Sequence, residues 1–214
     1  MVPGWSTTFT AVVALVVGWA GWTGAEYILH RFAMHAAGGR GLVSREHLEH
    51  HVTPVWTVSA RNLVPWAGIV LVGVVGWGPL GWVVAGPAAA VGAAAGWGVG
   101  YSFYFYQHMV AHLRGPRTRY QRFVHKLHLQ HHFGSPSCNH SLSVPVWDWA
   151  FGTLEVPDRV RVPRRLAPTW MIGADGEVPA EHAADYLLVG ARDLSERTVM
   201  IDRARAFAAQ APAV

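Results

Sequence analysis

Histidine is the residue type that this sequence places most unusually. Twelve of the thirteen histidines lie between His30 and His140, most of them in four short boxes. The boxes contain His30 and His35; His47, His50 and His51; His108 and His112; and His128, His131 and His132. Imidazole is the commonest metal ligand in proteins and suits iron, zinc and copper. Because one zinc site uses only about three or four protein ligands, this set predicts two metal ions side by side.

The spacing inside the boxes predicts how the imidazoles are presented. Residues three and four apart share one face of an α-helix, so the second, third and fourth boxes can each direct their side chains to a common point. His30 and His35 are five residues apart and cannot share a face of one straight α-helix. Either the helix breaks between Met34 and Gly38, or the two histidines serve different metals. His125 and His140 flank the last box and are further potential ligands.

The rest of the sequence narrows the chemistry of this ligand set. The single cysteine, Cys138, excludes a thiolate cage. Haem would leave most of the histidines unexplained. A zinc transporter would place its ligands at the bilayer midplane, whereas the boxes are predicted at helix ends, which disfavours transport. An all-imidazole site favours redox chemistry on iron, with open positions for dioxygen. Ligating histidines usually donate their second N–H to a nearby acceptor, and Glu26, Asn139 and Asp148 are the candidates for that supporting role.

The elements that must position the boxes are apolar. Hydrophobic residues make up 51% of the 214 residues and charged residues 14%, whereas ordinary globular chains carry about 25% charged residues. The net charge of +4 does not indicate nucleic-acid binding, because no stripe of Lys and Arg is interleaved with aromatic residues. The composition predicts an all-α, multi-pass transmembrane protein with a cytoplasmic, histidine-rich cap for two metal ions.

Three apolar runs predict the membrane spans. The spans cover about residues 9–29, 62–78 and 81–106. The first run lacks a basic leading segment and is predicted to be an anchor rather than a cleaved signal peptide. A turn is expected at Gly78–Gly81, and Gly92, Gly96 and Gly100 are spaced for close helix packing in lipid.

The distribution of charge predicts the sidedness of the membrane topology. Two crossings separate the second box from the third, so all the boxes would reach the same membrane face. All 17 Lys and Arg residues fall in segments on that face. By the positive-inside rule, the boxes and the C-terminus are therefore predicted to be cytoplasmic and the N-terminus outside.

The chain after the boxes carries no motif with an evident chemistry. Residues 1–155 are predicted to form the catalytic transmembrane domain, and residues 156–214 a cytoplasmic C-terminal tail. Within that tail, segments 179–189 and 195–209 have helical patterns. The basic residues of Arg159–Arg165 either touch anionic head groups or are simply solvated.

The order and spacing of the boxes resemble the fatty acid hydroxylase/sterol desaturase superfamily of membrane non-haem di-iron oxygenases. The similar motifs are His30-Arg-Phe-Ala-Met-His35, His47-Leu-Glu-His50-His51, His108-Met-Val-Ala-His112 and His128-Leu-Gln-His131-His132-Phe133. The stretch from Asn139 through Ser143, Trp147-Asp148 and Phe151-Gly152-Thr153 is similar to the segment after the last box in that family. The resemblance covers about residues 25–155.

The resemblance implies cofactors, partners and a reaction. The ten box histidines would bind two iron ions, with zinc possible in purified protein, and dioxygen would be the co-substrate. No cytochrome b5 domain is visible, so electrons would come from a separate ferredoxin or cytochrome b5-like donor. The expected reaction is hydroxylation or desaturation of an unactivated C–H bond of a lipid in the bilayer, with a fatty acyl chain as the main expectation.

Two alternatives stay open from the sequence. The same chemistry could act on a sterol or carotenoid ring, or the protein could be a non-catalytic membrane metal-binding protein. Oxygen consumption with a reductant would separate the enzymes from the metal-binding protein. Lipid analysis would separate an acyl substrate from a ring.

Overall fold

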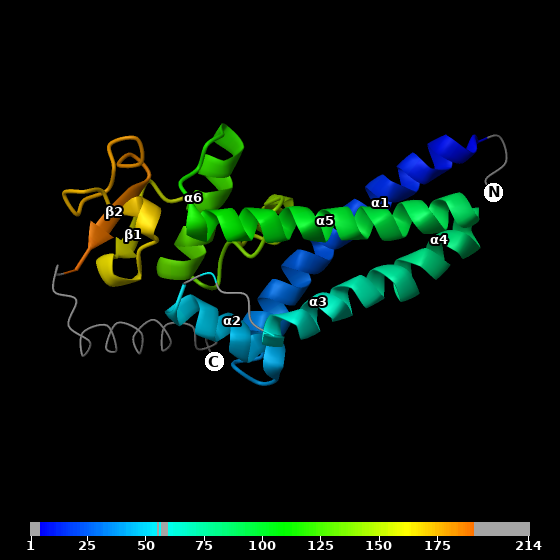
Figure 1. The fold of residues 1–214 in the computed structure, drawn as a ribbon, viewed down its shortest axis with the longest axis horizontal. Helices are drawn as coiled ribbons and strands as arrows, with labels where there is room; N and C mark the ends of the chain where they lie inside the picture. Colours follow the sequence, from blue (N-terminus) through cyan, green and yellow to red (C-terminus); the bar gives the residue numbers. More distant parts are fainter. Residues whose placement is uncertain (1–4, 55, 57–59, 191–214) are drawn as a thin grey trace. The chain divides into compact units, whose positions relative to one another are not determined.

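The computed structural model describes residues 5–54, 56 and 60–190, which group into two compact units (Figure 1). Of the described residues, the first unit comprises 5–26 and 60–106, and the second comprises 27–54, 56 and 107–190. Every box histidine belongs to the second unit. Two of the three boundaries, after residues 26 and 106, fall inside long helices, so each of these helices contributes to both units.

The first unit is built from long helices. Its first helix, α1 (Thr7–Ile28), continues directly into a π-helical segment, η1 (Leu29–Ala36). The next runs through α3 (Ala60–Val72), the π-helical turn η2 (Gly73–Trp77) and α4 (Gly78–Ala85), and the last is α5 (Pro87–Leu113). The prediction of a mostly helical protein is therefore confirmed.

The predicted turn at Gly78–Gly81 is wrong, because the chain stays helical there and turns at Gly86. Pro79 lies in the first turn of α4, directly after η2. A π-helical turn changes the hydrogen-bond register, and the start of a helix tolerates a residue without an N–H. Gly86 has φ 85°, in the left-handed region that glycine adopts without a steric penalty.

The two helices on either side of Gly86 pack against each other in opposite directions. The Trp97 indole N–H donates to the Ile69 carbonyl at 2.9 Å, while the backbone at Gly81 lies against Ala89. As residue numbers fall in one helix they rise in the other, so α3–α4 and α5 form an antiparallel hairpin.

Glycines on α5 allow close contact with α1, as their spacing predicts. A Cβ at Gly92 would collide with the Ala11 carbonyl oxygen, and one at Gly96 with the Leu15 carbonyl oxygen. Backbones this close leave no room for a side chain, which is the way small residues let helices associate in lipid.

Two stretches of the described residues are long and apolar enough to cross a membrane. These are Thr7–Ala36 and Trp66–Ala85. They match the first two predicted spans, and the second is longer than predicted because α3 and α4 form one continuous helix. Its large side chains, such as Val83 and Val84, are exposed, as expected of a lipid-facing helix. The third predicted span, in α5, does not pass the same test, because its glycine, tyrosine and tryptophan content lowers its mean hydropathy.

The second unit contains the shorter elements. They are α2 (Leu42–Val52), α6 (Arg119–Phe133), α7 (Val146–Ala150), β1 (Val160–Pro163), the 3₁₀ turns η3 (Arg164–Leu166) and η4 (Thr169–Met171), and β2 (Tyr186–Val189). The α6 helix begins where the Thr118 hydroxyl accepts a hydrogen bond from the Gln121 N–H at 3.1 Å, the usual role of an N-cap threonine.

Two predictions for the C-terminal part are wrong. The fold is not all-α, because β1 and β2 pair in parallel with Val160 opposite Tyr186. The segment 179–189 ends in strand β2 rather than a helix: Tyr186 and Leu188 are buried while Leu187 is exposed. That alternation has the period of a strand. The predicted helix 195–209 lies outside the described residues.

Residues 155–190 pack on α6 and do not form a separate tail. Their apolar core contains Leu129 of α6, Val160, Val162, Met171, Tyr186 and Leu188. Around this core, Lys126 of α6 bonds Asp185 at 3.0 Å, and the Trp170 indole donates to the Ala111 carbonyl of α5 at 3.1 Å. This region therefore braces both helices that carry the third and fourth boxes.

Candidate metal centre

Ten imidazoles gather into two groups within the second unit. Group A contains His30, His35, His47, His51 and His131, and group B contains His50, His108, His112, His128 and His132. In each group one nitrogen per ring lies within 4.8 Å of all the others. The ten members are the ten histidines of the four boxes, brought together from four helical segments.

The π-helix η1 explains how His30 and His35 enter the same group. A π-helix bonds residue i to i+5, so residues five apart come to lie one above the other, which they cannot do in an α-helix. Their ring centroids are 5.1 Å apart. Neither sequence alternative, a break before Gly38 or service to different metals, describes this solution.

The sequence analysis expected each three-histidine box to direct its side chains to one point. The structure instead divides each of these boxes between the two groups. In α2, His47 and His51 join group A while His50 joins group B. In α6 the assignment is reversed, because His131 joins group A and its neighbours at i−3 and i+1 join group B. Consecutive residues of an α-helix point about 100° apart, so an HxxHH box serves two adjacent sites.

The distances between the ring nitrogens are those expected around a bound cation. In group A, His47 Nε2 lies 3.0 Å from His30 Nε2, 2.9 Å from His35 Nε2 and 3.0 Å from His51 Nε2. One ring nitrogen carries a single lone pair or a single hydrogen and cannot form three hydrogen bonds. Donors about 2.1 Å from a shared ion are about 3.0 Å apart at right angles and about 3.4 Å apart in a tetrahedron. The measured edges match the right-angled arrangement.

Group B shows the same spacing. His50 Nε2 lies 2.9 Å from His108 Nε2 and 3.1 Å from His112 Nε2, and His112 Nε2 lies 2.9 Å from His128 Nε2. The donor set of each group, five neutral nitrogens converging on one point, therefore fits a metal ion.

Burial keeps these imidazoles neutral. Desolvation, followed by repulsion from neighbouring histidines, holds the pKa values of His47, His51 and His131 well below the usual 6.5. Burial likewise lowers the pKa of His50 to about 4. Because a histidine must be deprotonated to bind a metal, both groups are in the binding form at neutral pH.

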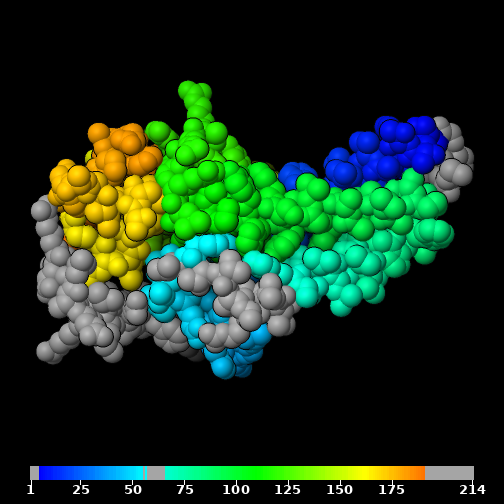
Figure 2. All heavy atoms as spheres, in the orientation of Figure 1, coloured from blue at the N-terminus to red at the C-terminus, as the bar shows by residue number. Residues whose placement is uncertain are grey.

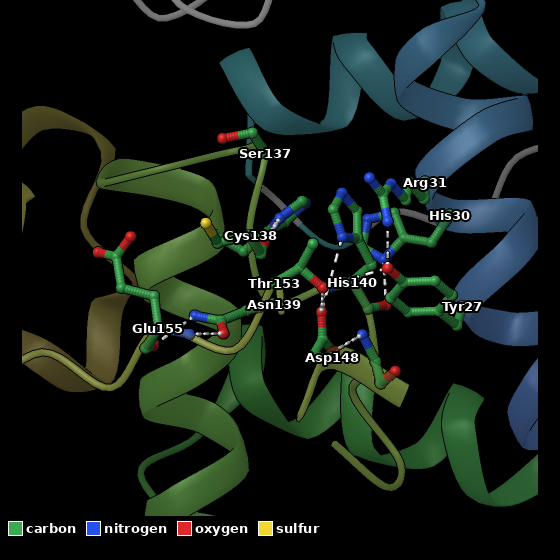
Figure 3. Close-up of polar contacts among 12 residues, drawn as sticks. Tyr27, His30, Arg31, Ser137, Cys138, Asn139, His140, Asp148, Thr153 and Glu155 are labelled. Carbon is green, nitrogen blue, oxygen red and sulfur yellow. Dashed lines mark hydrogen bonds and ion pairs between the residues drawn. The ribbon is translucent and has the colours of Figure 1, made fainter. Parts of the chain in front are cut away.

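A short loop after α6 orients two rings of group A (Figure 3). His30 Nδ1 lies 2.5 Å from the carbonyl oxygen of His140, and His131 Nδ1 lies 2.7 Å from that of Cys138. A backbone carbonyl can only accept, so each ring places its hydrogen on Nδ1 and leaves Nε2 free for a metal. These carbonyls carry no side-chain signal and could not be found from the sequence.

Asp148 and Asn139 hold that loop in place through backbone groups, and Asp148 also through the His140 ring (Figure 3). The buried Asp148 carboxylate accepts from the N–H groups of His140 and Ser141 at 2.8 and 2.7 Å, and from the Thr153 hydroxyl at 2.7 Å. Burial opposes ionisation, but these bonds and the His140 ring outweigh it and lower the pKa of Asp148. Asn139 adopts φ 57°. Its side-chain amide donates to the Glu155 carbonyl and accepts a hydrogen bond from the Glu155 N–H, both at 2.8 Å.

The remaining predicted site residues lie outside both groups. The His140 ring is 5.5 Å from the rings of His30 and His131 and 3.6 Å from Asp148. His125 is fully buried, and neither of its ring nitrogens has a hydrogen-bond partner among the described residues. Glu26 is buried in the first unit, so its supporting role stays a prediction.

Trp56 is a further neighbour of group B that the sequence analysis did not connect with the site. Its ring centroid lies 5.0 Å from that of His108 and 6.4 Å from that of His112. His50 and His108 are half-buried, whereas all five members of group A are buried. The sequence offers no spacing signal for Trp56, because it follows α2 outside any helix.

Comparison with known proteins agrees with the geometry. The profile of the Fatty acid hydroxylase family matches residues 15–153. The chain is 30% identical over 137 residues to dihydroceramide fatty acyl 2-hydroxylase FAH2 of Arabidopsis thaliana, covering 62% of this chain and 56% of the relative. It is 28% identical over 147 residues to dihydroceramide fatty acyl 2-hydroxylase FAH1 of the same plant, covering 67% and 61%.

These alignments thus span little more than half the length of either curated relative. No solved structure matches the chain significantly. The family profile includes the first, second, third and fourth boxes and ends at Thr153, whose hydroxyl bonds Asp148. From its histidine groups and this match, the chain belongs to the fatty acid hydroxylase family.

Proposed function

We propose that this protein is an integral-membrane oxygenase that hydroxylates a fatty acyl chain of a lipid with two iron ions. The observation that carries the proposal is the division of ten neutral imidazoles into two adjoining five-nitrogen groups. Family membership supports a lipid-hydroxylating oxidoreductase. The two apolar helices support its place in the membrane.

The residues that would hold the ions follow from the two groups. Group A would hold one ion and group B the other, and bound iron would supply the redox chemistry that activates dioxygen and oxidises a C–H bond. The overall reaction is R–H + O₂ + 2e⁻ + 2H⁺ → R–OH + H₂O. It needs two electrons from outside the chain, for which a ferredoxin or a cytochrome b5-like protein is the proposed donor.

The protein's own contribution is to hold and orient the ligands. Neutral imidazoles would hold an ion in each group without adding negative charge to the site. The Cys138 and His140 carbonyls fix two rings of group A, while the half-buried His50 and His108 place group B on the more accessible side.

The substrate class is inferred from the relatives. Both are named as dihydroceramide fatty acyl 2-hydroxylases, so we infer an amide-linked or esterified acyl chain, hydroxylated at carbon 2. The boxes are proposed to face the cytoplasm and the N-terminus the outside, as the distribution of the 17 basic residues indicates.

The proposal is tested by expressing the protein in a host without 2-hydroxy lipids, together with a ferredoxin system. We expect 2-hydroxy fatty acids to appear in the total lipid hydrolysate, and the purified protein to contain about two metal ions per chain, one for each group. The matched control is His108→Ala. An altered sterol or carotenoid in place of hydroxy acids would overturn the acyl assignment. Bound metal without oxygen consumption would overturn the assignment as an enzyme and favour a non-catalytic metal-binding protein.

A further inference from the structure

The short helix α7 has its polar and apolar side chains on the opposite sides from those expected in water. Asp148 is fully buried, with 0% of its surface exposed, while the next residue, Trp149, is 73% exposed. Val146 and Phe151, at the two ends of the same segment, are 47% and 57% exposed. In water-soluble proteins tryptophans are mostly covered, and a carboxylate is fully buried almost only when it is paired, as Asp148 is. The exposed Val146, Trp149 and Phe151 are therefore the unusual feature of this segment. The outer side of α7 is therefore suited to an apolar surrounding.

The contacts of α7 place it beside a membrane-crossing helix. The Phe151 ring stacks on Tyr27 with centroids 5.1 Å apart and planes at 15°. The Tyr27 hydroxyl also lies 3.2 Å from the Thr153 hydroxyl. Tyr27 belongs to the apolar stretch Thr7–Ala36, and lies about 30 Å along the helix from Thr7.

That length identifies the depth of the contact. The hydrocarbon core of a bilayer is about 30 Å thick, so a helix entering it at Thr7 leaves it near Tyr27. At this level Arg31 donates to the Tyr27 hydroxyl at 2.5 Å, with its charge one turn beyond the hydrocarbon. Tyrosine, tryptophan and arginine are the residues that anchor helices at this boundary.

We propose that α7 is embedded in the membrane interface, with Val146, Trp149 and Phe151 in contact with phospholipid. An indole at that depth buries its ring among acyl chains and keeps its N–H near the head groups. The inner side of α7 presents Asp148 to the loop that orients His30 and His131. The same segment therefore touches lipid on one side and supports group A on the other. This inference concerns lipid contact and does not depend on the substrate.

The experiment measures the depth of single positions in the full-length protein in phosphatidylcholine nanodiscs. Cys138 is the only cysteine, so Cys138→Ser provides a background for Trp149→Cys and, separately, Val146→Cys, each labelled with bimane. The matched control is Ala184→Cys, an exposed position on the turn before β2. Quenching is compared between a nitroxide carried on a lipid acyl chain and iodide in the water.

We expect the ratio of lipid-phase to iodide quenching to be several-fold higher at positions 149 and 146 than at 184, with blue-shifted emission. Iodide quenching at 149 and 146 as strong as at 184 would show α7 in water and overturn the proposal. Shielding from both quenchers would show a protein partner or second copy over α7, and would overturn it as well. If one labelled variant fails to fold, the other still decides the result.

Discussion

Groups A and B are built to one plan but are held differently. Each takes an i, i+4 pair from one HxxHH box and the i+3 histidine from the other, and each is completed by two histidines from the end of a long helix. The completing pair in group A comes from a π-helix, and in group B from the α-helical α5. The two sites are therefore nearly equivalent in their donors.

The surroundings of the two groups differ. All of group A is buried, and two of its five rings bond backbone carbonyls of one loop. In group B two rings are half-buried, and His132 has no hydrogen-bond partner for either ring nitrogen among the described residues. The difference in burial makes group B the more accessible group, and we infer that group A is held more rigidly.

Removing one ligand from each group is the strongest test of this contrast. We expect His131→Ala and His108→Ala each to lower product formation by more than about 100-fold, since loss of an outer partner alone costs about 10–100-fold. Bound metal should fall from two ions toward one in both variants, as measured by mass spectrometry of the purified protein.

The two variants should differ in stability. His131 is fully buried and its Nδ1 bonds the Cys138 carbonyl, whereas His108 is half-buried. His131→Ala should therefore lower the unfolding temperature further than His108→Ala. Normal activity in either variant would exclude that residue as a ligand. Equal destabilisation would remove the contrast between a rigid and an open half.

Asp148→Asn tests the support of group A alone. The amide nearly preserves the volume of the side chain, but it replaces a carboxylate that accepts bonds from His140, Ser141 and Thr153. We expect about 10–100-fold weaker binding of the group A ion and a loss of about 2 kcal/mol in unfolding free energy, measured by metal competition and by denaturation. The control is Asp175→Asn, at an exposed position. Weaker binding of the group B ion instead would contradict the assignment.

The sequence predicted which histidines come together better than how they are arranged. The ten histidines were identifiable because imidazoles at helical spacing are rare in an apolar chain. Their division into groups was not, because it depends on the 100° step between neighbouring residues and on which helices face one another. The π-helix η1 was also missed, since no residue type specifies it and tertiary contacts decide its register.

The fold shows the same limit. Glycine spacing on α5 predicted the contact with α1, because close packing in lipid depends on residue size alone. The turn at Gly86 and strand β2 were mispredicted, since Pro79 also suits the start of a helix and Tyr186–Val189 is too short to show a clear period. Carbonyl partners such as that of His140 leave no trace in a sequence.

Lowering the pH should distinguish the two groups by the order in which they release their ions, an effect smaller than that of the substitutions above. Protons compete with a metal for imidazole, and burial lowers the pKa of His50 in group B to about 4 and holds those of His47 and His51 in group A well below the usual 6.5. His50 and His108 are half-buried whereas group A is buried, so protons reach group B more readily. As the pH falls from 7 toward 4, we expect group B to release its ion before group A. The release is measured by metal analysis of protein desalted at each pH.

In the metal-free protein, the lowered histidine pKa values determine how the free energy of unfolding changes with pH. A histidine whose pKa is lower folded than unfolded binds more protons when unfolded, so its stabilising contribution is complete above pH 6.5 and is lost as the pH falls toward the folded value. Denaturation of metal-free protein should show this loss between about pH 6.5 and 4. Release of both ions at the same pH would mean that the groups are equally protected.

Trp56 offers the mildest test, on the open side. Its ring borders His108 and His112 but offers no metal-binding atom. Trp56→Ala should therefore leave two ions bound while lowering kcat/KM by about 10-fold, the low end of the range for one lost apolar contact. Trp56→Phe keeps an aromatic ring and should recover most of the activity. Kinetics beside metal analysis distinguish the cases. Loss of the group B ion in Trp56→Ala would show that this side is held by packing after all, and group B would then resemble group A more closely than its exposure indicates.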